Sequence, residues 1–412
     1  MSQITNINQN QSDKYNFINT SKTNWLNKKP SNPNSHIKLA SLFSGIGAIE
    51  HAFERMKIKH QIIFAGDIDD KCRQSYFANY NLNKHDWHED INFFNAKKYK
   101  GNIDILVGGS PCQAFSMVGN RKGFRDPRGS LFYEFARVIK ECKPKIFIFE
   151  NVKGLANHDN GATWATIKKV FEQDLKYKIH SDILNSKHFG IPQNRERFFV
   201  VGFRHGYYQE FCFPEKINLQ TTMQDFLEDN VDTKYYLKEK GVKFVTKATN
   251  RKKRYTQING TVALCQKANQ QFNWHGDFVF EKMNKKINFD EFIFDIKPIE
   301  KKYYLSDKVK KYVLSNGTKN FWIENRTDLE IARPILSSMH KMHRAGVDNY
   351  ITYNRGKIRK LTPRECHRLM GFRDSYKIVV SDTAAYQQAG NSIVVDVLIA
   401  LLKELDITRF GN

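Results

Sequence analysis

Between residues 36 and 205, short apolar runs alternate with amphipathic stretches. Five runs have the length and composition of buried strands: 38–43, 62–65, 103–107, 145–149 and 198–202. Two further stretches, 48–56 and 131–141, carry apolar residues at helical spacing. Alternation of this kind predicts an α/β domain built on a doubly wound, mixed sheet.

The rest of the chain lacks this rhythm. Residues 1–35 are rich in Asn, Gln, Ser and Lys, which predicts a disordered or loosely attached arm. Residues 205–354 are mixed and basic, with interleaved aromatics, and predict a separate smaller domain. Helical patterns return over 355–412, and the strongly apolar last helix predicts that this segment completes the domain formed by 36–204.

The charge, the cysteine spacing and the hydropathy of the chain limit the classes of partner and compartment that suit it. The 412 residues include 66 Lys and Arg against 43 Asp and Glu, a net charge of +23 that favours nucleic acid. The six cysteines have neither Cys-x-x-Cys nor metal-ligand spacing, so we expect no metal, no disulfide framework and a reducing compartment. Without a membrane-length apolar run or a signal core, we expect a soluble, cytoplasmic protein with no membrane partner.

One loop carries the leading candidate for chemistry. Gly108-Gly109-Ser110-Pro111-Cys112-Gln113 follows the strand 103–107, which places Cys112 past the carboxyl end of a strand, where open α/β sheets bind ligands. The polar segment 121–129 then has the composition of a lid. Taken alone, Cys112 is more readily explained as a small apolar residue packed under a turn.

A glycine turn and an acid mark the first two strands. Gly45 and Gly47 let a ligand approach the backbone closely, while Glu50, in place of a third glycine, disfavours a nicotinamide cofactor. Asp67 ends the second strand, where it would either accept hydrogen bonds from ribose hydroxyls or cap a helix. Asp90 is another strand-end acid or a turn residue.

Later strands carry an acid and two arginines. Burial at the tip of the strand 145–149 would favour the protonated form of Glu150, as an acid catalyst requires; the alternative is a solvated turn residue. Arg195 and Arg197, two residues apart at a strand's entry, are predicted to point to one side. They would form a surface ion-pair face or a fork that grips a phosphate or base edge.

A basic run in the middle segment suggests phosphate contacts, although such runs are often only solvated surface. Its four cationic residues are Arg251, Lys252, Lys253 and Arg254.

Taken in order, six motifs resemble those of the C5-cytosine DNA methyltransferases. They span 36–205 and 355–412: Phe43-Ser44-Gly45-Ile46-Gly47, Gly66-Asp67, Ser110-Pro111-Cys112-Gln113, Glu150-Asn151-Val152, Gln193-x-Arg195-x-Arg197 and Gly390-Asn391-Ser392. The amino-acid sequences of segments 360–366 and 123–161 most resemble those of the HhaI type of bacterial enzyme.

The resemblance implies a covalent mechanism on a cytosine flipped out of duplex DNA. Cys112 would add to C6 of the base, Glu150 would hold N3 and the exocyclic amine, and Arg197 with Arg195 would orient the base. The loop 116–129 would close over it. Substrate contacts are then expected in and beside this loop, from Gln113, Ser116 and Arg128.

The resemblance also implies that S-adenosylmethionine is the methyl donor, leaving as S-adenosylhomocysteine, with no metal. The residues expected to hold it are Phe43, Gly45, Gly47, Asp67, Ile68, Asp90, Gly108, Pro111, Leu131, Asn391 and Ser392.

Several alternatives stay open. Where relatives often carry a Thr-Leu pair, this chain has Pro334-Ile335-Leu336-Ser337, so the residues that replace the flipped base are unassigned. A tRNA-methylating enzyme, a catalytically silent DNA-binding protein and a nicotinamide dehydrogenase are the rivals. Family habit suggests a monomer acting on double-stranded DNA in the bacterial cytoplasm, on the nucleoid, with a cognate restriction endonuclease.

Overall fold

The computed structural model describes residues 24–110, 130–229, 231–268, 273–282 and 356–412, together with 308, 312, 317, 318, 321 and 322. The chain divides into two compact units. The larger comprises Met1–Asp229, Gly260–Gly276 and Thr362–Asn412, and the smaller comprises Asn230–Asn259 and Asp277–Leu361.

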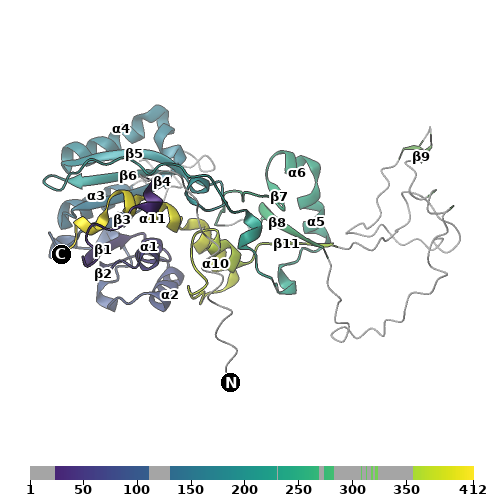
Figure 1. Ribbon diagram of the computed structural model, residues 1–412, viewed down its shortest axis with the longest axis horizontal. Coiled ribbons are helices and arrows are strands. Elements are labelled where there is room, and N and C mark those ends of the chain that lie inside the picture. Colours follow the sequence, from purple (N-terminus) through teal and green to yellow (C-terminus); the bar gives the residue numbers. More distant parts are fainter. Residues whose placement is uncertain are drawn as a thin grey trace, which may run out of the picture. The chain divides into compact units, whose positions relative to one another are not determined.

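A six-stranded sheet with strand order β2-β1-β3-β4-β6-β5 organises the larger unit (Figure 1). Its strands are β1 (Ile37–Leu42), β2 (His60–Phe64), β3 (Ile105–Gly108), β4 (Ile146–Val152), β5 (Tyr177–Asn185) and β6 (Glu196–Arg204). Strands β2, β1, β3 and β4 run parallel, whereas β6 is antiparallel to both of its neighbours. The predicted mixed α/β sheet is therefore confirmed.

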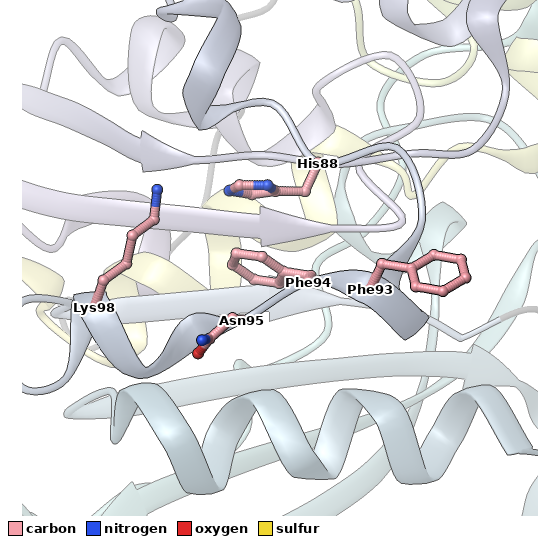
Figure 2. A pocket seen from close by; sticks show the side chains of 5 residues that line it. All are labelled: His88, Phe93, Phe94, Asn95 and Lys98. Carbon is pink, nitrogen blue, oxygen red and sulfur yellow. The ribbon is translucent and has the colours of Figure 1, made fainter.

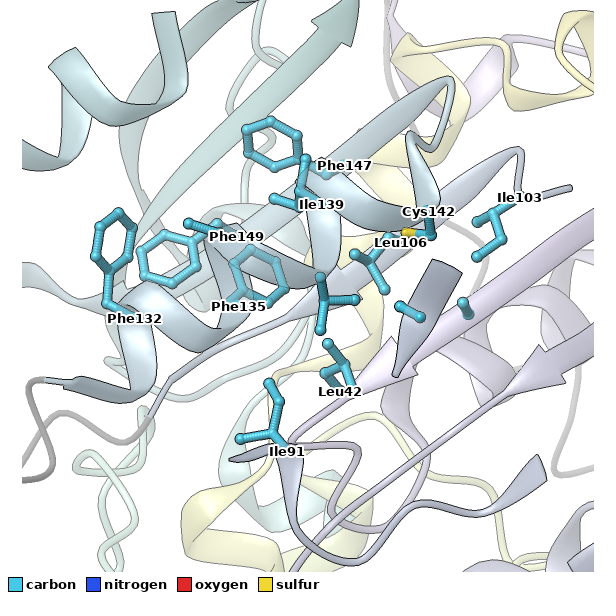
Figure 3. Close-up of a cluster of buried hydrophobic side chains, with 14 of the residues drawn as sticks. Leu42, Ile91, Ile103, Leu106, Phe132, Phe135, Ile139, Cys142, Phe147 and Phe149 are labelled. Atoms are coloured by element: carbon cyan, nitrogen blue, oxygen red, sulfur yellow. The ribbon is translucent and has the colours of Figure 1, made fainter. Parts of the chain in front are cut away.

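An aromatic core covers one face of this sheet. Helix α3 (Ser130–Cys142) places Phe132 and Phe135 against Phe147 and Phe149 of β4, and all four side chains are at most 1% exposed (Figure 3). Helix α4 (Ala162–Lys169) and the π-turn Val170–Asp174 continue this layer. Because full burial of a Phe stabilises a fold by about 1.5–3 kcal/mol, the central strands form a rigid support for the residues at their ends.

Helix α1 (Ala48–Met56) packs against the last helix, α11 (Val395–Glu404). Arg55 of α1 binds Asp396 through two hydrogen bonds, of 2.7 and 2.8 Å. In Figure 1 the C-terminal segment, drawn in yellow, returns to the first strands. The C-terminal residues are thus part of the same folded unit as the N-terminal sheet.

Two shorter helices precede α11. Helix α9 (Pro363–Arg368) begins with a capping box in which Thr362 and Glu365 each bind the other's backbone N–H. Helix α10 (Asp382–Asn391) leads to α11. By length and composition the stretch Asp382–Glu404 could cross a membrane, but 83% of its most apolar window is buried inside the protein.

The segment that precedes β1 is folded onto the larger unit. Trp25, in the 3-10 turn Trp25–Asn27, is 3% exposed and donates its indole N–H to the Glu215 carbonyl at 3.0 Å. Lys403 of α11 donates to the Leu26 carbonyl at 2.8 Å, and Ser31 hydrogen-bonds Asp406. The prediction of a loose arm is wrong for residues 24–35, because one tryptophan anchors a segment whose average composition is polar.

A three-stranded sheet of order β11-β8-β7 forms part of the smaller unit. Its strands are β7 (Thr256–Ile258), β8 (Gly276–Lys282) and β11 (Gly356–Lys360). Helices α5 (Glu239–Thr246) and α6 (Ala248–Lys252) precede them, and β9 (Gly317–Thr318) pairs with β10 (Phe321–Trp322).

The boundary differs from the predicted 205–354. Residues 205–229 and 260–276 fold with the larger unit, where Phe211, Met223 and Phe226 are at most 6% exposed. Met223 N–H donates to the Thr261 carbonyl at 2.8 Å, which ties the two segments together. After residue 205 the alternation of strands and helices is lost because the chain of the larger unit becomes irregular, not because a new domain begins.

Candidate active site

The carboxyl ends of β1, β2, β3 and β4 meet at one edge of the sheet because these strands are parallel. Strand β6 starts at that edge because it is antiparallel to β4. The residues that leave the parallel strands and those that enter β6 are thus gathered at one place, as expected for the ligand site of an open α/β sheet.

Glu150 and Arg197 form an ion pair at this edge, with Arg197 Nε 3.1 Å from Glu150 Oε1. Register brings them together: Glu150 lies opposite Phe199, and Arg197, two residues before Phe199, shares its face of the sheet. Only 14% of the Glu150 side chain and 18% of that of Arg197 are exposed. Strand β4 extends to Val152, so Glu150 lies within the strand rather than beyond its tip.

The protonated form of Glu150 is favoured by its surroundings. Burial raises the pKa of this carboxyl above its ordinary value, and the positive charges of Arg197 and, more weakly, Arg195 only partly oppose that effect. The result agrees with the direction expected from the sequence for an acid at the end of so apolar a strand.

Glu150 also lies against the start of the Cys112 loop. A Cβ on Gly109 would come within 2.8 Å of both the carbonyl oxygen and Oε2 of Glu150, so only glycine fits there without displacing the carboxylate. The next residue along β4, Asn151, donates its side-chain amide to the Ser110 carbonyl at 3.3 Å. The chain therefore leaves β3 beside Glu150. The loop residues predicted to act, Pro111, Cys112, Gln113, Ser116 and Arg128, lie outside the described residues.

Arg195 makes different contacts from Arg197. It is 2% exposed, and its guanidinium donates to three backbone carbonyls: Gln266 at 3.0 Å, Gly390 at 3.0 Å and Ser392 at 2.8 Å. Burial, with the nearby charge of Arg197, lowers its pKa to about 10.

Arg195 thus ties two other segments of the chain, 260–268 and 390–392, to the start of β6, and its predicted catalytic role stays a prediction. Its contacts differ from those of Arg197 because β6 begins at Glu196, so the two-residue period of a strand does not govern Arg195.

The segment 260–268, which sequence reasoning missed, completes this cluster. Ala263 pairs with Gln193 in a short parallel bridge, and Gln193 Oε1 accepts from the Gln266 N–H at 3.1 Å. Gln193 also donates to the Leu369 carbonyl at 2.8 Å. These bonds place Cys265 Sγ 3.7 Å from Arg195 Nη1. The strand-like run Val262-Ala263-Leu264 was the available signal, hidden inside a region assigned as a whole to another domain.

At the end of β1, the chain makes an open, constrained turn. Phe43 and Gly45 have φ angles of 52° and 53°, and Gly47 has 78°, all in the left-handed region. A Cβ on Gly47 would lie 2.1 Å from the Tyr80 ring, whereas one on Gly45 would meet nothing within 4 Å. Gly45 therefore has open space on its Cβ side, whereas Gly47 is enclosed by Tyr80, and close approach of a ligand to this turn stays a prediction.

Asp67 orients this turn from the neighbouring strand. Its Oδ2 accepts from the Gly45 N–H at 2.9 Å and its Oδ1 from the Asp69 N–H at 3.0 Å. Asp69, not Asp67, caps helix α2 (Asp70–Asn79), which removes the helix-cap alternative for Asp67. Burial raises the pKa of Asp67. The adjacent Ile68 is 77% exposed, an apolar surface at the tip of β2.

Asp90 is a capping residue, since its Oδ1 accepts from the Asn92 N–H at 2.9 Å at the start of the 3-10 turn Ile91–Phe93. A shallow pocket lies beside this turn (Figure 2), lined by His88, Phe93, Phe94, Asn95 and Lys98. His88 stacks on Phe94 with ring centroids 3.9 Å apart, and burial lowers its pKa to about 4, so the ring is neutral.

The other predicted cofactor residues have varied settings. Gly108 pairs with Leu42, directly before Phe43, and a Cβ there would lie 2.8 Å from the Leu42 carbonyl. Leu131 is half-buried in α3. Asn391 is exposed at the end of α10, and Ser392 is 8% exposed with its carbonyl bound to Arg195.

The predicted DNA-contacting run lies in the smaller unit. Arg251 and Lys252 end helix α6, and both are exposed, as are Lys253 and Arg254. Within the described part of the chain, no cluster of three or more His, Cys, Asp or Glu side chains could hold a metal ion.

Comparison with known proteins gives a consistent result. The model of the C-5 cytosine-specific DNA methylase family matches residues 37–406. The type II methyltransferase M.HpaII of Haemophilus parainfluenzae is 34% identical over 400 residues, covering 93% of each chain. M.HhaI of Haemophilus parahaemolyticus, also a type II methyltransferase, is 30% identical over 363 residues, covering 88% of this chain and 92% of its own.

A solved structure shares the fold. The Dnmt2 methyltransferase of S. pombe superimposes with a TM-score of 0.58 at 20% identity, covering 90% of this chain and 98% of its own. The resemblance read from the six motifs is confirmed, and this chain belongs to the C-5 cytosine-specific DNA methylase family.

Proposed function

We propose that this protein transfers a methyl group to C5 of a cytosine flipped out of double-stranded DNA, with Cys112 as the nucleophile. The observation that carries the proposal is the Glu150–Arg197 pair, which lies against Gly109 at the start of the Cys112 loop. An acid whose pKa is raised by burial, a cation and a loop bearing a thiol are the groups that covalent activation of a cytosine ring requires.

Cys112 would add to C6 of the base as a thiolate. Addition is unfavourable unless the ring accepts electron density, and Glu150 supplies that assistance by holding a proton at N3. Attachment of the thiol then makes C5 nucleophilic. After the methyl group is transferred, loss of the C5 proton and departure of the thiolate restore the aromatic ring.

Arg197 would stabilise the negative charge that develops on the base and fix its orientation. Its guanidinium already binds Glu150, so both groups would contact the Watson–Crick edge of the same base. Arg195 would stabilise the site indirectly, by holding in place the two segments that carry Gln266, Gly390 and Ser392.

The turn after β1 fits S-adenosylmethionine, which supplies the electrophilic methyl group when bound. The open Gly45 backbone would admit the ligand, and each Asp67 carboxylate oxygen keeps a lone pair free for a ribose hydroxyl. The exposed Ile68 and half-buried Phe43 offer apolar contact for an adenine ring. Gly47, Asp90, Gly108, Pro111, Leu131, Asn391 and Ser392 stay predicted members of this site.

Double-stranded DNA is the proposed substrate because the net charge of +23 and the exposed run 251–254 suit a polyanion. The type II relatives suggest a restriction–modification role in a bacterial cytoplasm, beside a cognate endonuclease. We also propose that the protein acts as a monomer.

The test is covalent trapping. Duplex oligonucleotides with 5-fluorocytosine at C positions are incubated with S-adenosylmethionine and protein, because fluorine cannot leave as a proton does. We expect a stable adduct at Cys112, and sequencing of the trapped DNA gives the recognised site. Cys112→Ser should form no adduct yet bind the cofactor normally. An adduct with tRNA alone would overturn the choice of DNA, and none with either would overturn the reaction.

A further inference from the structure

Cys265 occupies an unusual position among the five cysteines that the structure describes. Its half-buried sulfur lies 3.7 Å from Arg195 Nη1 and 3.6 Å from the Gln266 carbonyl. Cys72, Cys142 and Cys366 are buried, and Cys212 is exposed. Only Cys265, among these five, adjoins the arginine pair of the proposed active site.

Two like charges meet at this point. Burial, and next to it the positive charge of Arg197, lowers the pKa of Arg195. The ionisable groups facing this cluster come from three described elements: Glu150 from β4, the arginines from the start of β6, and Cys265 from the segment 260–268. The C-terminal segment contributes only the carbonyls of Gly390 and Ser392.

Glu150 cannot neutralise the positive charge of the two arginines and act as an acid at the same time. When it carries a proton, as the proposed reaction requires, the two arginines have no carboxylate counter-charge within the described cluster. A thiolate at Cys265 would neutralise one of them. It would also raise the affinity of Glu150 for its proton, because a nearby negative charge disfavours a carboxylate.

We propose that Cys265 is a positioning residue of the reaction: its sulfur is the counter-charge that holds the arginine pair and keeps Arg197 on Glu150. This inference rests on the proposed function. The direction of ionisation agrees with it: burial raises the pKa of the Cys265 thiol, but Arg195 and Arg197 together outweigh burial and lower it below 9.0.

The first test needs no activity. The wild-type protein is treated with iodoacetamide over a range of pH, and alkylation of each cysteine is followed by mass spectrometry. Because only the thiolate reacts, the rate at Cys265 should reach its plateau at lower pH than the rate at exposed Cys212. A plateau for Cys265 at the same or higher pH would overturn the proposal.

The second test is kinetic. We compare kcat of the wild type with Cys265→Ser, which keeps an acceptor for Arg195 but cannot ionise in this range, and with Cys212→Ser as the matched control. The ratio of wild-type to Cys265→Ser kcat should rise with pH to about tenfold, the effect of one pKa unit on the protonated fraction of Glu150. Its inflection should coincide with the alkylation inflection of Cys265. The control ratio should stay at one.

A pH-independent ratio would assign Cys265 to packing and overturn the proposal. Failure of the wild type to form the 5-fluorocytosine adduct would instead refute the proposed function, and the alkylation profile would still test the charge cluster.

Discussion

The different settings of Arg195 and Arg197 predict that equivalent substitutions will have different physical effects. Changing either to Met keeps most of the side-chain volume and removes the guanidinium. We expect Arg195→Met to lose folding stability with a modest effect on turnover, and Arg197→Met to lose turnover with a modest effect on stability.

The magnitudes follow from the contacts. Arg195→Met leaves three carbonyl oxygens without their donor, at about 1–3 kcal/mol each. Removing the buried charge offsets part of this loss of stability. The lowering of the Arg195 pKa from 12.5 to about 10 means that burying its charge destabilises the fold by about 3 kcal/mol. Together these contributions leave a net loss of about 0–6 kcal/mol, so we expect about 3 kcal/mol. Arg197→Met removes a largely buried ion pair, and its effect on stability stays modest because Glu150 can take up a proton once its partner is gone. Loss of a charge-stabilising donor lowers kcat by about 100-fold or more.

Urea unfolding followed by tryptophan fluorescence measures the first quantity, and methyl transfer to the recognised duplex measures the second. Kinetics of Arg195→Met are recorded at low temperature, where unfolding controls show the variant to be folded; there we expect kcat within about tenfold of the wild type, a smaller loss than removal of a direct charge-stabilising donor causes. If Arg195→Met were as stable as the wild type and as inactive as Arg197→Met, the clamp role would be wrong and Arg195 would be catalytic.

Three further predictions test the surrounding structure. Asp67→Ala should weaken S-adenosylmethionine binding by about 1.5–3 kcal/mol through loss of charged hydrogen bonds, and an unchanged Kd by calorimetry would contradict the ribose assignment. Burial raises the Glu50 pKa above 4.5, so ionisation of this carboxyl destabilises the fold increasingly as the pH rises above 4.5; Glu50→Gln should match the wild type at about pH 4 and exceed its urea midpoint at pH 8, and a more stable wild type at pH 8 would refute this. Trp25→Ala should cost about 3–5 kcal/mol of unfolding free energy, whereas a negligible loss would restore the loose-arm prediction.

The five predicted apolar runs correspond to β1, β2, β3, β4 and β6 of the sheet, but periodicity did not predict which flanking segments fold with it. Runs such as 145–149 are so apolar that no other environment suits them, and the structure buries them as β4. Trp25 shows why average composition is a poor guide for the segment before β1. The composition of that segment is polar and predicts disorder, but the single buried side chain of Trp25 anchors it to the folded unit. The irregular segments 205–229 and 260–276 were also missed. Backbone hydrogen bonds and scattered aromatic side chains hold them to the larger unit, and these residues follow no regular spacing along the sequence.

At the site, local rules were right wherever the residue lies inside a regular element. Glu150 and Arg197 are both within strands, and the two-residue period with antiparallel register brings them to 3.1 Å. Cys265 depends instead on a bridge between Ala263 and Gln193, residues 70 positions apart, which no local pattern encodes. Long-range pairing of irregular chain is the step that a sequence pattern leaves open.

The motif Gln193-x-Arg195-x-Arg197 therefore combines two kinds of requirement in five residues. Gln193 and Arg195 bind backbone groups of segments 260–268 and 369–392, while Arg197 faces the acid. Substituting any of the three would lower activity, the first two by loosening the unit and the third by removing charge from the reaction. Loss of activity alone consequently cannot assign a role within this motif. The assignment needs stability and kcat measured on the same variant, because a residue that acts only by holding the unit together has little effect on kcat in protein that is fully folded.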